Sequence, residues 1–170
     1  MKLKYLTNNP SQTKKLGEIL AKEVLKTQPK KRLRPSRHPP KGPLALIFGL
    51  EGDLGGGKTT FLQGFARGLG IKEKILSPTF VIIKRFEIPK SRHLTSNIQY
   101  LIHIDCYRIE KPKEILDLGL KEIISNPKNI VAIEWSDRVR KILPKGTLIL
   151  KFQVANKNKR KIVIKQKNGK

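Results

Sequence analysis

The chain has one cysteine, few acidic residues and no long apolar run. Cys106 has no second cysteine to pair with, so no disulfide forms within the chain. No stretch approaches the roughly 20 apolar residues of a membrane helix, and lysines and asparagines interrupt the first ten residues, where a secretion signal would be apolar. We therefore expect a cytoplasmic protein with no membrane contact. Its 170 residues suffice for one domain over 1–170, with a disordered tail at 167–170.

Acidic residues number only 13 against 37 lysines and arginines, which gives a formal net charge of +24. Contact with nucleic acid or another polyanion would use this charge. Alternatively, a lysine-rich genome composition would explain the positive charge, and the charge would then have no function. Residues 28–42 hold six basic residues, four prolines and no acid, and we expect them to form a flexible insertion. No aromatic pattern marks this segment, or the acid-free stretch after Asp137, as a base-stacking surface.

A glycine-rich segment is the most informative feature that is present. Residues 52–59 read Gly-Asp-Leu-Gly-Gly-Gly-Lys-Thr and fit G-x-x-x-x-G-K-[ST], the phosphate-binding P-loop. Its glycines allow backbone N–H groups to approach phosphate oxygens, and the positive end of the next helix points at the same oxygens. Lys58 would then reach the β- and γ-phosphates, and Thr59 would place its hydroxyl on magnesium. The alternative is a glycine-rich turn in which Lys58 is merely solvated.

The residues around the loop have the pattern that it requires. An apolar run at 44–48 predicts a buried strand, and apolar residues at helical spacing predict a helix over 60–70 that Gly70 ends. Further helices are expected over 11–26 and 112–124, and strands over 80–87, 98–105, 129–134, 146–155 and 160–166. The first of these helices would have Ser11 as its N-cap and an apolar face of Leu16, Ile19, Leu20 and Val24. This mixture predicts an α/β fold with a mixed parallel and antiparallel sheet.

Two acids follow apolar runs and are candidates for a magnesium site beside Thr59. Asp105 and Glu134 each end a predicted buried strand. Ligands of open α/β sheets bind at the carboxyl ends of the strands, where both acids would lie. The alternative is that each acid caps a helix or pairs with an arginine such as Arg108 or Arg138.

The neighbours of these acids are less decisive. Trp135 follows Glu134 directly, which raises the chance that it lines a nucleotide site, although a single tryptophan is more often a packing residue. His103 alternates with isoleucines and is expected to be structural. Recognition of guanine usually needs a carboxylate, and the sequence has no acid beyond Asp137. This favours ATP over GTP.

Four segments in a fixed order then give a family resemblance. They are the glycine-rich loop at 52–60, Ser-Pro-Thr-Phe at 77–80, His-Ile-Asp-Cys-Tyr-Arg at 103–108 and Ile-Glu-Trp at 133–135. This set resembles the bacterial TsaE (YjeE) family, from about Ser11 to Arg160. The resemblance implies a P-loop NTPase-like three-layer fold. The chain departs from the family pattern at Cys106 and Ser136, and residues 28–42 exceed the usual short turn.

The resemblance also implies site residues. The catalytic residues would be Lys58, Asp105 and Glu134. The nucleotide contacts would be Thr13, Gly55, Gly56, Gly57, Lys58, Thr59, Thr60, Trp135 and Arg160. The magnesium ligands would be Thr59 and Glu134, and residues 77–79 look like the switch-like loop of the family.

Members of this family are P-loop ATPases needed to make threonylcarbamoyladenosine beside the tRNA anticodon. The resemblance therefore implies a magnesium-dependent ATP hydrolase that docks on the TsaD–TsaB pair, with tRNA reached through that complex or by the basic segments. No arginine stands out as one that completes the site in cis, so we expect slow hydrolysis that the partners accelerate. Two alternatives remain: a P-loop small-molecule kinase, for which the segment 89–97 is a short lid, and a non-enzymatic RNA-binding module.

Overall fold

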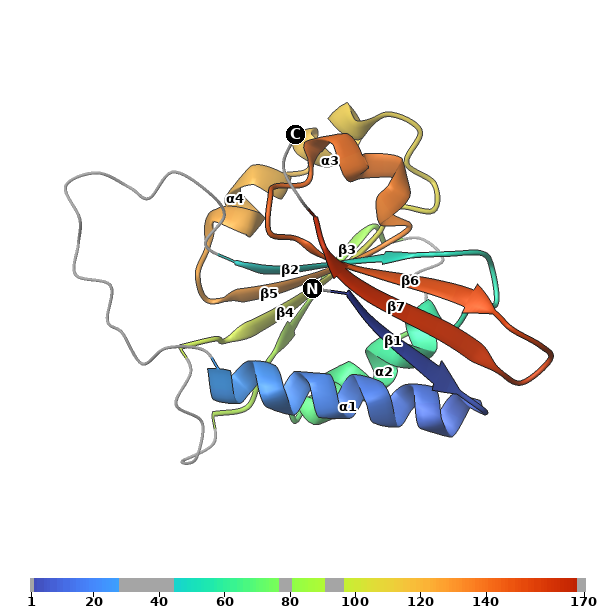
Figure 1. Ribbon diagram of the computed structural model, residues 1–170. Coiled ribbons are helices and arrows are strands. Elements are labelled where there is room, and N and C mark those ends of the chain that lie inside the picture. Colours follow the sequence, from blue (N-terminus) through green and yellow to red (C-terminus); the bar gives the residue numbers. More distant parts are fainter. Residues whose placement is uncertain (1, 28–44, 77–80, 91–96, 168–170) are drawn as a thin grey trace.

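The computed structural model describes residues 2–27, 45–76, 81–90 and 97–167, and in them one sheet lies between two layers of helices (Figure 1). The expected insertion at 28–42 and the loop at 77–79 lie outside these ranges. Within the described residues, no helix has the length and apolar content needed to cross a membrane.

The sheet has seven strands in the order β1-β7-β6-β2-β5-β4-β3. The strands are β1 (Lys2–Thr7), β2 (Leu46–Glu51), β3 (Ile83–Glu87), β4 (Tyr100–Asp105), β5 (Asn129–Glu134), β6 (Leu148–Val154) and β7 (Arg160–Gln166). The helices are α1 (Pro10–Thr27), α2 (Lys58–Gly68), α3 (Pro112–Asp117), α4 (Leu120–Ser125) and the 3-10 helix η1 (Ser136–Ile142). Strands β4, β5, β2 and β6 are parallel, whereas β3, β7 and β1 join antiparallel. The predicted α/β fold with a mixed sheet is confirmed.

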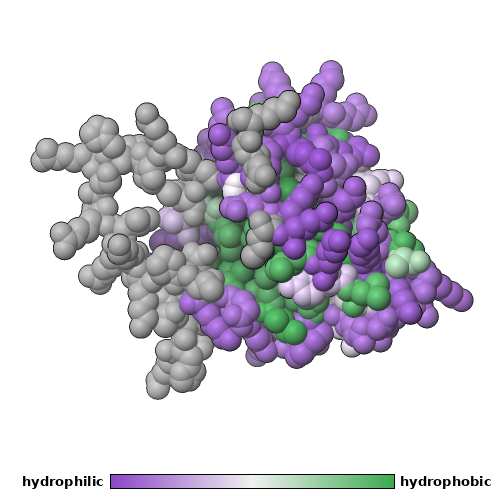
Figure 2. All heavy atoms as spheres, viewed as in Figure 1, coloured by the Kyte–Doolittle hydropathy of each residue, from purple (hydrophilic) through white to green (hydrophobic). Residues whose placement is uncertain are grey.

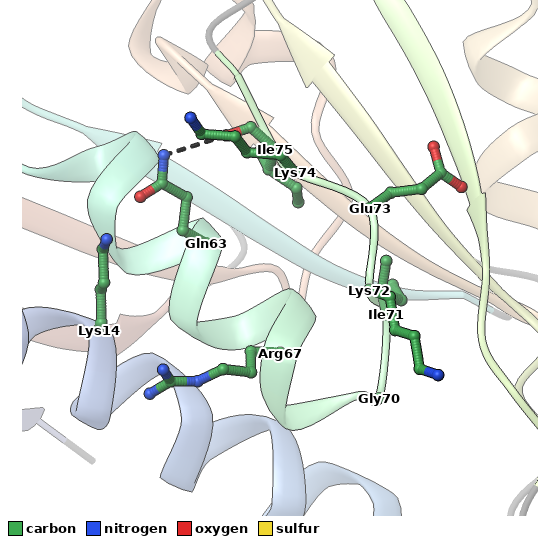
Figure 3. Close-up of a pocket in the computed structure, with 9 residues that line it drawn as sticks. All are labelled: Lys14, Gln63, Arg67, Gly70, Ile71, Lys72, Glu73, Lys74 and Ile75. Atoms are coloured by element: carbon green, nitrogen blue, oxygen red, sulfur yellow. Dashed lines mark hydrogen bonds between the residues drawn. The ribbon is translucent and has the colours of Figure 1, made fainter.

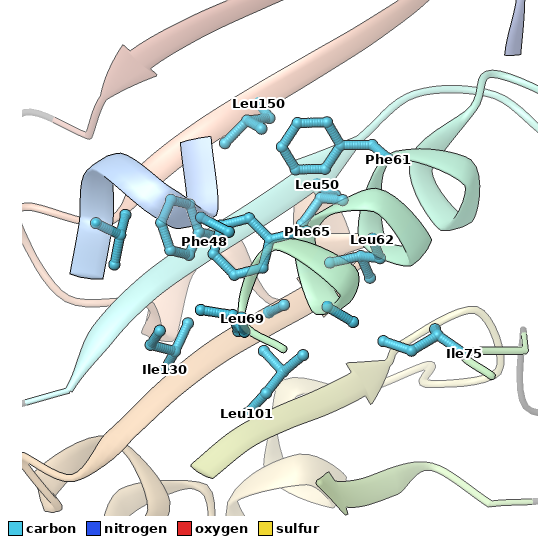
Figure 4. Close-up of a cluster of buried hydrophobic side chains, with 14 of the residues drawn as sticks. Phe48, Leu50, Phe61, Leu62, Phe65, Leu69, Ile75, Leu101, Ile130 and Leu150 are labelled. Atoms are coloured by element: carbon cyan, nitrogen blue, oxygen red, sulfur yellow. The ribbon is translucent and has the colours of Figure 1, made fainter. Parts of the chain in front are cut away.

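The first core lies between the sheet and the layer of α1 and α2 (Figure 4). Phe48 of β2 meets Phe65 of α2 with ring centroids 5.1 Å apart, and Phe61 meets Phe152 of β6 at 5.6 Å. All four rings are buried, and the burial of each ring stabilises the folded state by roughly 1.5–3 kcal/mol. This packing fixes α2, and with it the loop that precedes α2, against β2.

Helix α1 packs on α2 through small residues, and two expectations about it are wrong. Asn9, rather than Ser11, caps the helix, because its Oδ1 accepts the Gln12 N–H at 2.9 Å and the helix begins at Pro10. Ile19 is 49% exposed, because the buried face is centred on Gly17 and its neighbours instead. That face consists of Thr13, Gly17, Ala21, Val24 and Leu25.

The close approach of these helices depends on Gly64 of α2. A Cβ atom at this position would lie 1.9 Å from the Lys14 carbonyl oxygen of α1, and backbone atoms cannot move aside. We expect Gly64→Ala to lower the free energy of unfolding by about 3 kcal/mol, at the upper end of the usual cost of overpacking. For a chain of this size that is a fall of about 6–12 °C in Tm, measured by thermal unfolding. Alanine is the better helix former, so propensity alone would give the opposite sign. Lys15→Ala on the exposed side of α1 is the control, and an unchanged Tm for Gly64→Ala would contradict this packing.

The second core lies on the other side of the sheet, beneath α3, α4 and η1 (Figure 1). The single helix expected over 112–124 is in fact two helices. Gly119 stands between them with a φ of 84°, a left-handed conformation that interrupts the helical hydrogen bonding. Ile115 and Leu120 are buried on this side.

The other elements that the sequence predicts are present, whereas β1 and η1 were not predicted. Gly70 ends α2 as expected: it has a φ of 84°, its N–H bonds the Arg67 carbonyl and the Ile71 N–H bonds the Ala66 carbonyl. A turn joins β6 to β7, and within it the Ala155 N–H donates to the Lys159 carbonyl at 3.0 Å. Lys167, placed in the tail by the sequence, donates its backbone N–H to the Thr147 carbonyl at 2.8 Å.

Candidate phosphate-binding site

The glycine-rich loop runs from the end of β2 to the start of α2, so the predicted order of strand, loop and helix is confirmed. The Gly56 N–H donates to the Asp53 carbonyl at 3.0 Å and closes the turn. Gly57 precedes α2 with a φ of 99°, where a side chain would be strained. The loop therefore lies at the carboxyl ends of β2 and β5, with its last residues presenting N–H groups at the start of α2.

A cavity of about 200 Å³ lies at this loop. Its lining residues are Leu54, Gly55, Gly56, Gly57, Lys58, Thr59, Thr60, Glu134 and Trp135. Eight of these nine were predicted as site residues, and the exception is Leu54, which is 79% exposed. The structure therefore brings the P-loop together with the end of β5.

One polar contact in this cavity joins α2 to β5. Thr59 Oγ1 lies 3.0 Å from each carboxylate oxygen of Glu134. Behind them, His103 Nε2 lies 3.1 Å from Glu134 Oε1, and both of these side chains are buried. Glu134 therefore has Thr59 and His103 as partners instead of the arginine of the alternative reading. Arg138 donates to the Ile109 carbonyl.

Asp105 lies beside Glu134 because the two are register partners on the adjacent parallel strands β4 and β5. Its Oδ1 accepts the Tyr107 N–H at 2.9 Å, which orients the carboxylate at the end of β4. His103 is two residues earlier in the same strand and so points to the same face. Two neighbouring strands thus deliver three polar side chains to one edge of the sheet.

Lys58 lies across the mouth of the loop. Its Nζ donates to the carbonyls of Gly52 at 2.6 Å and Asp53 at 2.9 Å, and it stands 3.8 Å from the centre of the Trp135 ring. Burial lowers the pKa of Lys58, and the negative charges of Glu134 and Asp105 oppose that shift. An anion beside this ammonium would favour its charged form, which burial disfavours.

Trp135 has a φ of 57°, the one positive φ among the non-glycine residues that the structure describes. Such a conformation costs on the order of 1–3 kcal/mol and persists where the surroundings enforce it. Here the ring packs between Lys58 and Tyr107, whose ring centroid lies 5.0 Å away. The strained turn directs the indole back over the loop instead of along β5.

Thr13 and Arg160 lie on the other side of the loop. Together with Gly55, Gly57 and Thr60 they line a second hollow of about 50 Å³. Arg160 Nη2 donates to the Gly55 carbonyl at 3.0 Å, and Thr13 Oγ1 lies 2.8 Å from Thr7 Oγ1. The N-terminal and C-terminal parts of the chain therefore both reach the loop, as the resemblance implies.

A larger hollow of about 550 Å³ lies along α2 and the segment after it (Figure 3). Its lining residues are Lys14, Gln63, Arg67, Gly70, Ile71, Lys72, Glu73, Lys74 and Ile75. Gln63 Nε2 donates to the Ile75 carbonyl at 3.0 Å and ties this segment to α2. None of the predicted site residues lines this hollow, so volume alone would have pointed away from the P-loop.

Comparison with protein families matches residues 7–162 to the family described as "Threonylcarbamoyl adenosine biosynthesis protein TsaE". The chain belongs to the TsaE family. TsaE of Bacillus subtilis is 34% identical over 160 residues, which cover 94% of this chain and 83% of that one. TsaE of Rickettsia felis is 31% identical over 156 residues, which cover 91% of this chain and 75% of that one. The TsaE family takes part in the biosynthesis of tRNA threonylcarbamoyladenosine.

A solved structure supports the same placement. The crystal structure of Bacillus subtilis YdiB matches with a TM-score of 0.65 and 29% identity, covering 99% of this chain and 87% of that one. The three-layer fold implied by the TsaE resemblance is therefore confirmed, together with the family.

Sequence reasoning missed one contact of the TsaE site and left one residue without a role. His103 was expected to be structural, and its bond to Glu134 was not foreseen, although its i, i+2 spacing from Asp105 in an apolar strand was a signal. Cys106 is fully buried, and burial raises the pKa of its thiol to about 12. The thiol therefore stays protonated at neutral pH, which makes it a poor nucleophile.

Proposed function

We propose that this TsaE-family chain binds ATP with magnesium and hydrolyses it, in support of the TsaD–TsaB complex. The observation that carries the proposal is the contact between Thr59 of the P-loop and Glu134 of β5, with Lys58 beside them. A P-loop hydroxyl and a strand-end carboxylate are the protein groups that hold magnesium in ATPases of this kind.

The donor set fits magnesium better than a transition metal. Among the described residues no group of three or more His, Cys, Asp or Glu side chains could hold a metal by itself. Magnesium needs few protein ligands, because it keeps several waters and shares the phosphates of the substrate. Thr59 and Glu134 would supply these oxygens. Once bound, the ion would neutralise charge on the phosphates.

The other residues have roles that follow from their positions. Lys58 would place its ammonium against the β- and γ-phosphates, and the N–H groups of residues 55–60 would hold their oxygens. Asp105, beside Glu134, would orient the attacking water. Trp135 would cover one side of the nucleotide, while Thr13 and Arg160 would contact it from the opposite side of the loop.

Two arginines near the site already donate hydrogen bonds to backbone carbonyls. Arg160 donates to the carbonyls of Gly55, Asn156, Lys157 and Lys159, and Arg138 donates to the Ile109 carbonyl. An arginine that stabilises the transition state can raise phosphoryl-transfer rates by 10³–10⁵. Without one in place, hydrolysis would be slow until a partner completes the site.

The test is phosphate release by the chain alone and with TsaD–TsaB. We expect TsaD–TsaB to raise turnover at least about tenfold, because completing the charge around the phosphates lowers the barrier by at least about 1.4 kcal/mol. Equal turnover with and without the partners would contradict the docking role. No release under either condition would contradict the hydrolase. A phosphorylated metabolite in place of free phosphate would support the small-molecule kinase.

A further inference from the structure

Among the described residues, β1, β7 and the part of β6 after Ile149 carry no helix on one face of the sheet. In the second core, the buried residues from the sheet come from the consecutive strands β2, β5 and β4, and none comes from β1, β6 or β7. Along β7, Ile162 and Ile164 point to the first core, so Lys161, Val163 and Lys165 point to the opposite face. In Figure 1, no described helix covers β7 and β1 on the side of the sheet where α3 and α4 lie.

Five lysines share this face, and we call them the lysine face: Lys2, Lys4, Lys151, Lys161 and Lys165. All five are exposed. They come from three strands that are adjacent in the sheet, and one of these, β1, is far from β6 and β7 in the sequence. Figure 2 shows hydrophilic residues gathered over β6 and β7 in this view.

The lysines surround Val163. Lys4 of β1 and Lys151 of β6 are its register partners on the two neighbouring strands. Lys161 and Lys165 stand two residues to either side of it on β7 itself. Strands lie about 4.8 Å apart, and two residues along a strand span about 6.7 Å, so the cations form a regular array.

This array is unfavourable by itself. Lys2 and Lys165 are directly opposed on antiparallel strands, where like charges destabilise the pair. No ion pair among the described residues involves any of the five. The acid nearest in register is Glu51 beside Lys151, and its buried carboxylate is already held by two hydrogen bonds from Arg140. A polyanion laid across the face would remove this repulsion.

We propose that the lysine face binds the phosphate backbone of tRNA, an interaction beyond the ATPase role proposed above. Protein–protein interfaces are depleted in lysine and enriched in aromatic residues and arginine, which this face does not offer. A row of cations spread over three strands instead fits the repeated charges of a nucleic acid. The family takes part in the biosynthesis of tRNA threonylcarbamoyladenosine, and tRNA is a polyanion of this kind.

The test compares two triple variants that lose the same charge. K4Q/K151Q/K165Q removes part of the lysine face, whereas K113Q/K121Q/K128Q removes three exposed lysines on the side of α3 and α4. Binding of an unmodified tRNA transcript is measured for the full chain between 50 and 200 mM salt, the interval over which such contacts weaken steeply. We expect the first triple to flatten the plot of log K against log salt by about 2–3, at roughly 0.7–0.9 per lost phosphate contact, and the second to leave it unchanged.

ATP affinity and thermal unfolding of both triples show whether each variant is folded. Equal losses of tRNA affinity in the two triples would overturn the proposal, because net charge alone would then suffice. Unchanged tRNA binding, with stimulation by TsaD–TsaB lost only in the first triple, would assign the face to an acidic protein surface and also overturn it. The tRNA-binding result can be interpreted even if the wild type does not hydrolyse ATP, because tRNA binding is measured without ATP.

Discussion

Lys58→Ala is expected to weaken ATP binding at least about 100-fold. The lost group is a buried ammonium at the mouth of the P-loop, 3.8 Å from the centre of the Trp135 ring. Each hydrogen bond to a charged group contributes about 1.5–3 kcal/mol, and two tenfold steps correspond to about 2.7 kcal/mol. The dissociation constant is measured by titration with a fluorescent ATP analogue and confirmed by calorimetry.

The larger hollow provides matched controls. Lys72→Ala and Lys74→Ala remove exposed lysines that line the 550 Å³ cavity along α2, and both should leave the Kd unchanged. If they weaken ATP binding and Lys58→Ala does not, the nucleotide binds in that cavity instead of at the P-loop. Thermal unfolding is recorded alongside, because Lys58 also bonds the carbonyls of Gly52 and Asp53.

Glu134→Gln is expected to lower turnover by a factor of at least about 100 at saturating ATP. The amide keeps the shape of the side chain and a partner for Thr59 but loses the negative charge that a magnesium ligand requires. Removing one stabilising group at a site of charge transfer costs about 10²–10³ in rate. Phosphate release at several magnesium concentrations measures the effect, with partial recovery expected at high magnesium.

Asp137→Asn is the control for this variant. Asp137 is an exposed acid three residues further on, and its charge also acts on Lys58. A loss as large in Asp137→Asn as in Glu134→Gln would show that the site needs only negative charge near Lys58. Full turnover in Glu134→Gln would remove this residue from the magnesium site.

Much of the site could be predicted because its residues follow local rules. The P-loop is a contiguous pattern, and Glu134 ends an apolar strand at the edge where ligands of such sheets bind. The bond from His103 to Glu134 could not be read from either strand alone, because it depends on the order of strands in the sheet. The same holds for Arg160, whose bond to the Gly55 carbonyl joins positions far apart in the sequence.

The errors in the fold have similar causes. Helical spacing placed Ile19 in the core, but the neighbouring helix requires small residues at the contact, and Gly17 and Gly64 meet there instead. Strand β1 was not foreseen, because all but its last residue are exposed and it is an edge strand paired only with β7. Gly119 was taken as part of a helix that it divides. Each outcome was decided by tertiary contact or backbone conformation instead of apolar periodicity.

The pairing of β1 with β7 also sets when this protein can fold during its synthesis. Thr7 and Arg160 are register partners, although 153 positions separate them in the chain. Strand β1 therefore leaves the ribosome long before β7, its partner in the sheet, and contacts between such distant residues slow folding. A nascent chain that ends before β7 already contains the whole P-loop, but it lacks Arg160, which closes that loop on one side. The proposed nucleotide site would therefore be completed only after β7 has been translated.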